Sequence, residues 1–298
     1  MPRRSSSLRK LSWPSILIAV AIVGCRQFSP EKSPPTARKP APRAPSRPDS
    51  PSRPALDSSN DGNLLLGNPT RAARDADNLL LDRATYSLSY NRQNGGPNWV
   101  AWHTDASDLG DVDRGNNFAP DPDLPSQSQI RPTDYRGSGY DRGHVCPSGD
   151  RTANKTDNSA TFYMSNMLPM TGALNRHVWA DLENYVRDQV RDGNEAYQIA
   201  GGAGSAERIK GKINVPQVCW KVVVFLPVGS GDLARINAQT RVLAVGIPNV
   251  DDKRLETGDF RSYLTSVSKL ESATKLDLLT QLPASVRKTL KNQVDAGR

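Results

Sequence analysis

The sequence predicts one domain of the α+β class over residues 64–298, and two observations support that prediction. Short segments with the alternation of β-strands recur along this part of the chain, and at least one long amphipathic helix lies among them. The helices do not alternate regularly with the strands, as they would in a parallel sheet built from crossover units. Strands interspersed with a few helices therefore favour the α+β class.

The first predicted element is a β-hairpin. Tyr86–Tyr90 alternates in the manner of a strand, and Trp99–Trp102 has the composition of a partner strand. Asn94–Pro97 lies between them and has the chemistry of a turn. Residues 104–136 are rich in Asp, Pro, Gly and Asn and indicate a long loop. Loops of this length are uncommon unless they serve a site.

The clearest predicted helix covers residues 174–192. Four apolar residues recur there at every fourth position, which places them on one face of a helix, and Gly193 ends the pattern. The four are Val178, Leu182, Val186 and Val190. Further strands are expected over residues 197–200, 220–226 and 242–247, and a last helix over 284–294.

Residues 1–25 have the plan of an export signal. Basic residues come first, followed by an apolar run over 11–24 that is too short to span a bilayer comfortably. The run ends Ile-Val-Gly-Cys, which is similar to the processing site of bacterial lipoproteins, where Cys25 would carry the lipid. The alternative is an ordinary signal peptide with an incidental cysteine. We expect export to the periplasm or outer surface, with a membrane anchor at Cys25 or, failing that, secretion.

Residues 26–63 are predicted to be a disordered linker, because nine prolines lie between Pro30 and Pro54 with almost nothing apolar among them. The signal and linker also carry most of the charge. Residues 1–63 contain eleven basic and four acidic residues, a net charge of +7, which leaves +1 of the chain's +8 for residues 64–298. Bulk charge therefore gives no argument for a polyanionic substrate, and such an argument must rest on locally placed arginines.

The other two cysteines leave an alternative open. Cys146 and Cys219 are 73 residues apart, a spacing that matches no zinc site. In an oxidising compartment they could form a disulfide, provided that their Cα atoms lie close together. Otherwise they are two small residues of the core.

The sharpest local feature is the sequence Asp-Arg-Gly-His at 141–144. An Asn166-x-x-Pro segment follows, then Asn175 and Glu183 on the predicted helix. This order and spacing resemble the DNA/RNA non-specific endonuclease family, the ββα-metal nucleases with a DRGH motif. The resemblance covers about residues 84–285 and looks closest to secreted cyanobacterial members. It implies the ββα-metal (His-Me finger) fold, with a central antiparallel sheet flanked by helices.

The chemistry of phosphodiester cleavage gives independent reasons for these residue types. Cleavage needs an activated water, a cation on the phosphate oxygens and help for the leaving oxygen. Neutral histidine is a good general base near pH 7, so His144 would take a proton from the attacking water. Asn175 offers an oxygen ligand suited to a hard ion, Mg²⁺ or Mn²⁺ in its place. Glu183 lies about 12 Å further along the helix and about 80° around it, within reach of a metal-bound water.

The resemblance implies roles for the remaining site residues. Arg142 and Arg187 would bind flanking phosphates, and Arg114 would stabilise the pentacovalent transition state. Asp141 would orient the site, and Asn166 would support it. The implied activity is cleavage of DNA and RNA with little sequence preference, leaving 5′-phosphate and 3′-hydroxyl ends. No stripe of aromatic residues suited to base stacking stands out in the sequence, which agrees with such an enzyme.

The chain departs from the family at two positions near the motif. Met170 stands where members commonly have glutamine, which would remove a polar group near the site. Cys146 puts a thiol two residues from His144. The other two histidines, His103 and His177, are interpreted as partly exposed residues that have no partner residue at a characteristic sequence spacing.

Two other functions stay open on the sequence: a catalytically weak nucleic-acid-binding lipoprotein, and an exported phosphodiesterase for small substrates. A full set of His144, Asn175, Glu183 and Arg114 argues against the first, because a binding module needs no general base. The sequence does not decide the biological role, the preferred metal, the oligomeric state or whether a dedicated protein inhibitor exists.

Overall fold

The computed structural model describes residues 62–297. The predicted export signal (1–25) and almost all of the predicted linker (26–63) lie outside the described residues. Within the part that is described, no helix has both the length and the apolar character needed to cross a bilayer.

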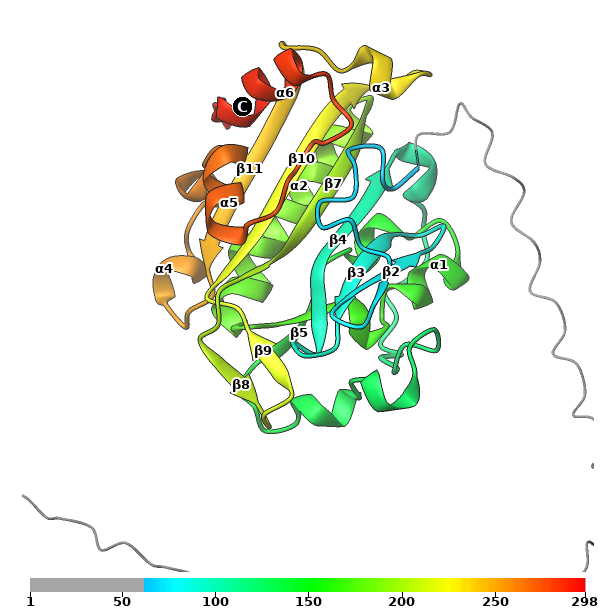
Figure 1. Cartoon of the computed structure of the whole chain (residues 1–298), viewed down its shortest axis with the longest axis vertical. Coiled ribbons are helices and arrows are strands. Elements are labelled where there is room, and N and C mark those ends of the chain that lie inside the picture. Colours follow the sequence, from blue (N-terminus) through cyan, green and yellow to red (C-terminus); the bar gives the residue numbers. More distant parts are fainter. Residues whose placement is uncertain (1–61, 298) are drawn as a thin grey trace, which may run out of the picture. The chain divides into compact units, whose positions relative to one another are not determined.

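A seven-stranded sheet forms the centre of the described chain, and all of its pairings are antiparallel. The strand order is β1-β2-β3-β4-β7-β10-β11, so that β4 and β7 join the N-terminal strands to the C-terminal ones (Figure 1). The strands are β1 (Arg74–Asp75), β2 (Asn78–Asp82), β3 (Ser87–Asn91), β4 (Gly96–Thr104), β7 (Asn194–Ala203), β10 (Val218–Pro227) and β11 (Arg241–Pro248). The predicted α+β class with a central antiparallel sheet is confirmed.

The predicted strands are present, most of them with longer bounds, although β3 is only shifted by one residue. β3 and β4 form the expected hairpin, in which a bulge falls between Ser89 and Tyr90. The strands expected over 197–200, 220–226 and 242–247 are β7, β10 and β11. β1 and β2, which extend the sheet beyond the hairpin, have no counterpart among the predicted elements.

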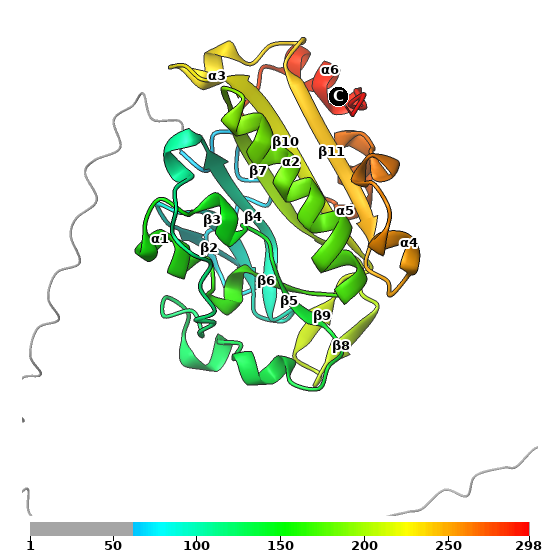
Figure 2. The same cartoon turned by 180° about the vertical axis from the view of Figure 1, so that it is seen from behind.

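Helices cover both faces of the sheet (Figure 1, Figure 2). α2 (Trp179–Arg191) crosses one face, and α5 (Val267–Thr274) and α6 (Ala284–Asn292) lie against the other. Successive residues of a strand point to opposite faces of a sheet, and β10 has apolar residues on both faces, so both faces must be covered. Cys219, Val223 and Phe225 belong to the core beneath α2, whereas Trp220, Val222, Val224 and Leu226 belong to the core beneath α5 and α6.

The predicted helix over 174–192 is present, but its first turn is wider than that of an α-helix. Leu174–Val178 forms a π-helical turn, and α2 begins at Trp179. The four residues predicted for the apolar face are all buried. The predicted last helix is α6, and residues 104–136 form a long loop as expected, with only short 3₁₀ turns between its ends.

The remaining elements lie outside the large sheet. β5 (Asp141–His144) pairs with β6 (Met167–Met170), and β8 (Glu207–Ile209) pairs with β9 (Ile213–Val215). β5 and β6 lie on the same side of the sheet as α2 (Figure 2). The short helices are α1 (Lys155–Ala160), α3 (Asp232–Arg235) and α4 (Lys253–Glu256).

Cys146, Cys219 and Met170 are all fully buried in the core between the sheet and α2. The two cysteines are free thiols, so the alternative of two small core residues holds and the disulfide does not form. Met170 packs against Gly143, where a Cβ atom would lie 2.5 Å from the Met170 Sδ. The sequence departure at residue 170 therefore places a thioether in the core.

Candidate active site

Three consecutive elements, β5, β6 and the helix that follows, form a ββα unit. β5 and β6 pair so that His144 lies opposite Met167 and Asp141 opposite Met170. The π-helical turn then brings Asn175 back beside Asp141, whose carboxylate lies 3.0 Å from the Asn175 Nδ2. Residues 34 positions apart in the chain thus meet at the start of the helix.

A pocket of about 280 Å³ opens where this unit meets the long loop. Six of the eight predicted site residues line it: Arg114, Arg142, His144, Asn175, Glu183 and Arg187. Asp141 and Asn166, the other two, do not line the pocket but contact segments that do. The remaining lining residues are Pro147, Ser148, Gly149, Thr152 and Ala180.

His144 is buried beside two phenylalanine rings. Its ring centroid lies 4.7 Å from that of Phe162, edge to face, and 5.6 Å from that of Phe118. Its Nε2 has no hydrogen-bond partner among the described residues. Burial, with the positive charges of Arg114 and Arg142, lowers the pKa of His144 to about 3. The imidazole is therefore neutral near pH 7, and while the pocket is empty the same burial and charges lower its affinity for a proton.

Two arginines lie against the same rings. The Arg142 guanidinium is 3.9 Å from the centre of the Phe118 ring, and the Arg114 guanidinium is 5.4 Å from that of Phe162. Such stacking holds a guanidinium in place without using its hydrogen-bond donors. Within residues 62–297 neither arginine donates to another side chain, so both can bind an anion.

Asp141 holds the Asn175 amide in a fixed orientation. Its carboxylate accepts a hydrogen bond from Asn175 Nδ2 at 3.0 Å and two from Arg176, at 2.8 and 2.7 Å. The bonds from Arg176, and then that from Asn175, lower the pKa of Asp141, which stays ionised near pH 7. Because the amide nitrogen is bound, the amide oxygen is the end of Asn175 left for the pocket. Nothing local in the sequence marks Arg176, an exposed residue of the helical segment.

Asn166 is fully buried and supports the chain just after His144. Its side chain accepts from the Cys146 N–H at 2.9 Å and donates to the Cys146 carbonyl at 2.8 Å. It also donates to the Thr161 carbonyl at 2.8 Å. One amide group thus pairs with both backbone groups of residue 146, as a neighbouring strand would. This geometry agrees with the supporting role that the resemblance implies.

A buried carboxylate that no sequence signal marks holds Arg187. The Arg187 guanidinium donates to Asp150 Oδ1 at 2.9 Å. It also lies against Gly149, where a Cβ atom would come within 2.8 Å of it, so glycine is required for this approach. Asp150 is 1% exposed and accepts further hydrogen bonds from Trp102 Nε1 and Gln198 Nε2, each at 2.9 Å. Arg187 is therefore positioned before any substrate arrives.

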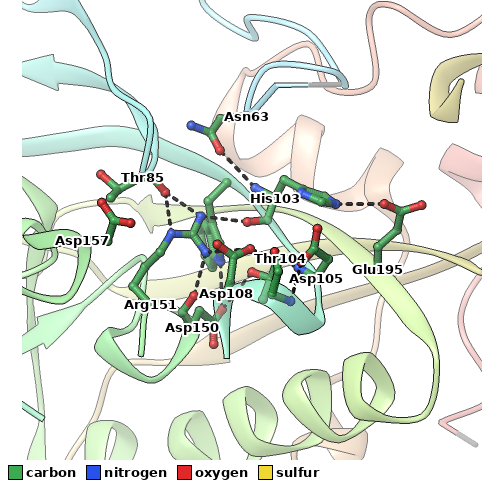
Figure 3. A network of polar contacts seen from close by, with 12 residues as sticks. Asn63, Thr85, His103, Thr104, Asp105, Asp108, Asp150, Arg151, Asp157 and Glu195 are labelled. Atoms are coloured by element: carbon green, nitrogen blue, oxygen red, sulfur yellow. Dashed lines mark hydrogen bonds and ion pairs between the residues drawn. The ribbon is translucent and has the colours of Figure 1, made fainter. Parts of the chain in front are cut away.

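Hydrogen bonds from Arg151 connect the segment that carries Gly149 and Asp150 to neighbouring parts of the chain (Figure 3). Arg151 donates to the main-chain oxygens of Thr85 and His103, and the His103 Nε2 lies 3.1 Å from Glu195. His103 is half-buried, in agreement with the interpretation as a partly exposed residue, and its partner is Glu195. A lone histidine in a strand gives no local sign of a partner 92 positions away in the chain.

Glu183 lines the pocket together with Asn175. A π-helical turn rotates the chain less per residue than an α-helix does. The angle between Asn175 and Glu183 around the helix axis is therefore smaller than the roughly 80° expected for a regular α-helix. Burial raises the pKa of Glu183 to about 7, although the positive charges of Lys221 and Arg187 lower it. The carboxyl group therefore changes its charge near neutral pH.

The pocket offers hard oxygen donors for a metal ion. Asn175 and Glu183 suit an ion such as Mg²⁺, which keeps several of its waters, better than a closed zinc site. Among the described residues, the clusters of histidine and carboxylate side chains close enough to share an ion lie elsewhere. They are His103 with Asp105 and Asp108, and His103 with Glu195 and Asp232.

Comparisons with known proteins agree with this geometry. The sequence model of the DNA/RNA non-specific endonuclease family matches residues 68–285. A nuclease of Nostoc sp. is 45% identical over 237 residues, which are 78% of this chain and 85% of that protein. Nuclease C1 of Cunninghamella echinulata is 35% identical over 234 residues, 72% of this chain and 88% of that protein. A chain of the EndoG/EndoGI crystal structure matches with a TM-score of 0.63 and 25% identity, over 77% of this chain and 94% of that chain.

Proposed function

The chain belongs to the DNA/RNA non-specific endonuclease family and has the ββα-metal fold of that family. We therefore propose that the pocket is the active site of a metal-dependent endonuclease. One observation carries the proposal: a neutral histidine with an unpartnered Nε2, an oriented amide and two arginines free to bind an anion meet in one pocket. These are His144, Asn175, Arg114 and Arg142. The proposed substrates are DNA and RNA.

His144 is the proposed general base. Its neutral imidazole takes a proton from a water molecule, the water oxygen forms a bond to phosphorus, and the bond from phosphorus to the 3′-oxygen breaks. The products are a 5′-phosphate and, once the leaving oxygen has gained a proton, a 3′-hydroxyl. A substrate phosphate beside Arg114 and Arg142 would offset their charge, which would raise the proton affinity of His144 at the moment when it is needed.

Asn175 is the proposed direct ligand of one Mg²⁺ ion, with Mn²⁺ as a substitute, and Glu183 the proposed acceptor for the waters that the ion keeps. When bound, the ion would neutralise charge on the phosphate oxygens and stabilise the leaving oxygen. Asp141 keeps the Asn175 oxygen available to the pocket by binding the amide nitrogen. Loss of Asp141 would therefore weaken metal binding through Asn175.

Arg114, Arg142 and Arg187 supply the positive charge that residues 64–298 lack as a whole. Guanidinium groups bind phosphate oxygens, which every nucleotide has, so they position a strand without reading its bases. The ion pair with Asp150 already orders Arg187, which reduces the entropy lost when a phosphate binds. This arrangement supports cleavage with little sequence preference on both kinds of nucleic acid.

The location and further partners of the enzyme are proposals from the sequence and from one relative. We propose that the protein is exported and anchored to a membrane by a lipid on Cys25, with secretion as the alternative. Incorporation of labelled palmitate by the wild type and not by Cys25→Ser would support the anchor, and absence of label from both would overturn it. Because the EndoG/EndoGI structure concerns inhibition of EndoG, a protein inhibitor that covers the pocket is the corresponding proposal for this chain.

The nuclease proposal is tested with the purified protein and its His144→Ala and Asn175→Ala variants, each incubated with supercoiled plasmid and with total RNA, in Mg²⁺ or in EDTA. We expect the wild type to degrade both polymers in Mg²⁺ only, and each variant to cut at least about a hundredfold more slowly. Binding of both polymers without cleavage under several metals would favour a nucleic-acid-binding lipoprotein. Turnover of a small phosphodiester, with both polymers intact, would favour a phosphodiesterase for small substrates.

A further inference from the structure

A basic patch covers the hairpin of β8 and β9 and the adjacent end of the long loop. The hairpin contributes residues 207–212 and the loop contributes residues 131–136, with two acidic residues and five basic ones between them. The five basic side chains, all exposed, are Arg131, Arg136, Arg208, Lys210 and Lys212. The net charge of the patch is therefore +3. Because residues 64–298 together have a net charge of only +1, the rest of the domain is net negative.

Direct contacts hold the two segments of the patch together. Lys210 Nζ donates to a main-chain carbonyl of the loop at 2.9 Å, and Lys212 Nζ lies 3.3 Å from Asp134. Beneath these contacts, Ile209 of the hairpin is buried in one small core with Tyr135 of the loop. The relative position of the two segments is therefore set before a ligand binds, which reduces the entropy lost on binding.

The patch continues into the proposed active site through the start of β5. Tyr140, which precedes β5, donates its hydroxyl hydrogen to Glu207 of the hairpin at 2.7 Å. Phe118, whose ring stacks on Arg142, packs against the same small core as the hairpin. Arg136 is six residues from Arg142, so their Cα atoms lie at most about 21 Å apart. β5 and the hairpin also lie side by side in both views (Figure 1, Figure 2).

Two arginines of the patch have donors that are free to bind an anion. Within residues 62–297, neither the Arg131 nor the Arg136 guanidinium has a hydrogen bond or an ion pair to another residue. Other arginines of the described chain are held in ion pairs with carboxylates, as Arg187, Arg241 and Arg254 are. An unpaired guanidinium can bind phosphate oxygens with two donors at once. The patch therefore offers the same kind of anion-binding group as the pocket.

The composition of the patch favours nucleic acid over a membrane as its partner. Protein surfaces that bind anionic lipid combine basic residues with apolar side chains that enter the bilayer. The exposed large apolar residues of the described chain are Val228, Val250 and Val294, and none of them belongs to the patch. Basic residues without apolar neighbours suit the backbone of a nucleic acid, where each strand of a duplex carries one charge per rise of about 3.4 Å.

We propose that this basic patch binds the phosphate backbone of the substrate outside the cut site, and thereby makes the nuclease prefer long nucleic acids. The inference rests on the proposed function of the pocket, to which it adds a second surface that contains no proposed catalytic residue. A distance of at most about 21 Å corresponds to about six base pairs of duplex, so the contacted phosphates lie within about that range of the scissile bond. Contacts to the backbone carry no sequence information, which agrees with cleavage at any sequence.

The first experiment measures binding without cleavage. His144→Ala protein in EDTA is titrated with a fluorescent duplex of about 30 base pairs over a range of salt concentrations. Adding Arg131→Ala and Arg136→Ala should weaken binding at least about fivefold at about 50 mM salt, and should lower the slope of log K against log salt by about 1 to 2. The matched control adds Lys269→Ala and Lys288→Ala, which remove two exposed charges on α5 and α6. It should lose less than about twofold.

Three outcomes of the binding experiment would overturn the proposal. Equal losses in the patch variant and in the control would mean that net charge alone sets the affinity. An unchanged salt slope would mean that the patch makes no contact with phosphate. Unchanged binding of DNA, with weaker binding of the patch variant to phosphatidylglycerol vesicles, would favour a membrane as the partner. If the arginine variant does not fold, Lys210→Gln in the hairpin turn takes its place.

The second experiment uses the protein with His144 in place and compares kcat/KM on plasmid DNA with kcat/KM on a dinucleotide, which has a single phosphodiester. With Arg131→Ala and Arg136→Ala, the ratio of the two values should fall at least about fivefold, through a higher KM for plasmid, because binding away from the cut site is lost. An unchanged ratio in an active nuclease would overturn the proposal. Binding of DNA that depends on the patch, in a protein that cuts no polymer under several metals, would support the patch and overturn the nuclease proposal instead.

Discussion

The two faces of the central sheet differ in what they bury. Beneath α5 and α6, β10 contributes Trp220, Val222, Val224 and Leu226 to a core that is mostly apolar. Beneath α2, the same strand contributes Lys221, and the polar side chains of Asp150, Gln198 and Thr104 are buried nearby. One strand thus contributes apolar residues to the core on both sides, and on the α2 side it adds a buried lysine near the polar groups behind the pocket.

This difference separates stability from function within a single element. Buried polar groups cost free energy unless each has a partner. In the described chain the His144 Nε2 and the Lys221 Nζ have no hydrogen-bond partner on the α2 side, and the Trp220 Nε1 has none on the other side. His144 lines the pocket, where departures from ideal packing are typical of functional sites. We therefore expect substitutions of the pocket residues on the α2 side to have their largest effect on activity, and substitutions in the core on the other side to have their largest effect on stability.

The largest effect is expected on the pocket side. His144→Ala should lower the rate of plasmid cleavage by about 10²- to 10⁴-fold, because it removes the general base. Its melting temperature should not fall in proportion, since the histidine has no Nε2 partner to lose. His103→Ala is the matched control: it breaks the pair with Glu195 outside the pocket and should leave the rate within about tenfold of the wild type. Equal losses in the two variants would contradict the assignment of the base.

A large effect of the opposite kind is expected on the other face. Trp220 is fully buried, so Trp220→Ala should lower the free energy of unfolding by about 3–5 kcal/mol through lost burial and a cavity. The rate of cleavage per folded molecule should stay within about threefold of the wild type. Urea denaturation and an assay below the melting temperature measure the two quantities. A fall in activity of the folded variant beyond that range would break the separation of the two faces.

A smaller effect concerns the pH dependence of stability. The folded pKa of Glu183, about 7, lies above its ordinary value of 4.5, so its contribution to stability is fully present below pH 4.5 and lost as the pH rises toward 7. The folded pKa of His144, about 3, lies below its ordinary value of 6.5, so its contribution is present above pH 6.5 and lost as the pH falls toward 3.

Glu183→Gln should therefore raise the free energy of unfolding, relative to the wild type, by at least about 1 kcal/mol more at pH 8 than at pH 4.5. His144→Ala should show the opposite trend, with its relative gain largest in acid. Urea denaturation at both pH values measures the two differences. A change that is the same at both pH values would mean that the carboxyl group titrates normally in the folded protein.

The smallest effect is expected outside the domain. Residues 26–63 carry basic residues, but the arginines of the pocket supply the local charge that cleavage needs. Deletion of residues 26–63 should leave the rate of plasmid cleavage within about tenfold of that of the full chain. A greater loss that grows as salt is lowered would show that the linker recruits substrate.

The sequence by itself determined the parts of this protein whose signal is local. The four-residue spacing from Val178 to Val190 predicted the buried face of α2, because that period is a property of the helix itself. The alternation around Tyr86–Tyr90 predicted a strand for the same reason. The motif at 141–144, with Asn175 and Glu183 after it, predicted residues that share a pocket through its resemblance to the endonuclease family.

Only the tertiary structure decided which distant residues became partners. Asp150 binds Arg187 across 37 positions of the chain, and Lys221 lies between Trp102 and Trp179, which come from a strand and a helix far from it in sequence. A lone aspartate or lysine in a sequence has the same appearance whether it is solvated or buried. Its environment is set by the packing of β4, β10 and α2 against one another, and that packing determines its charge, its partner and its use.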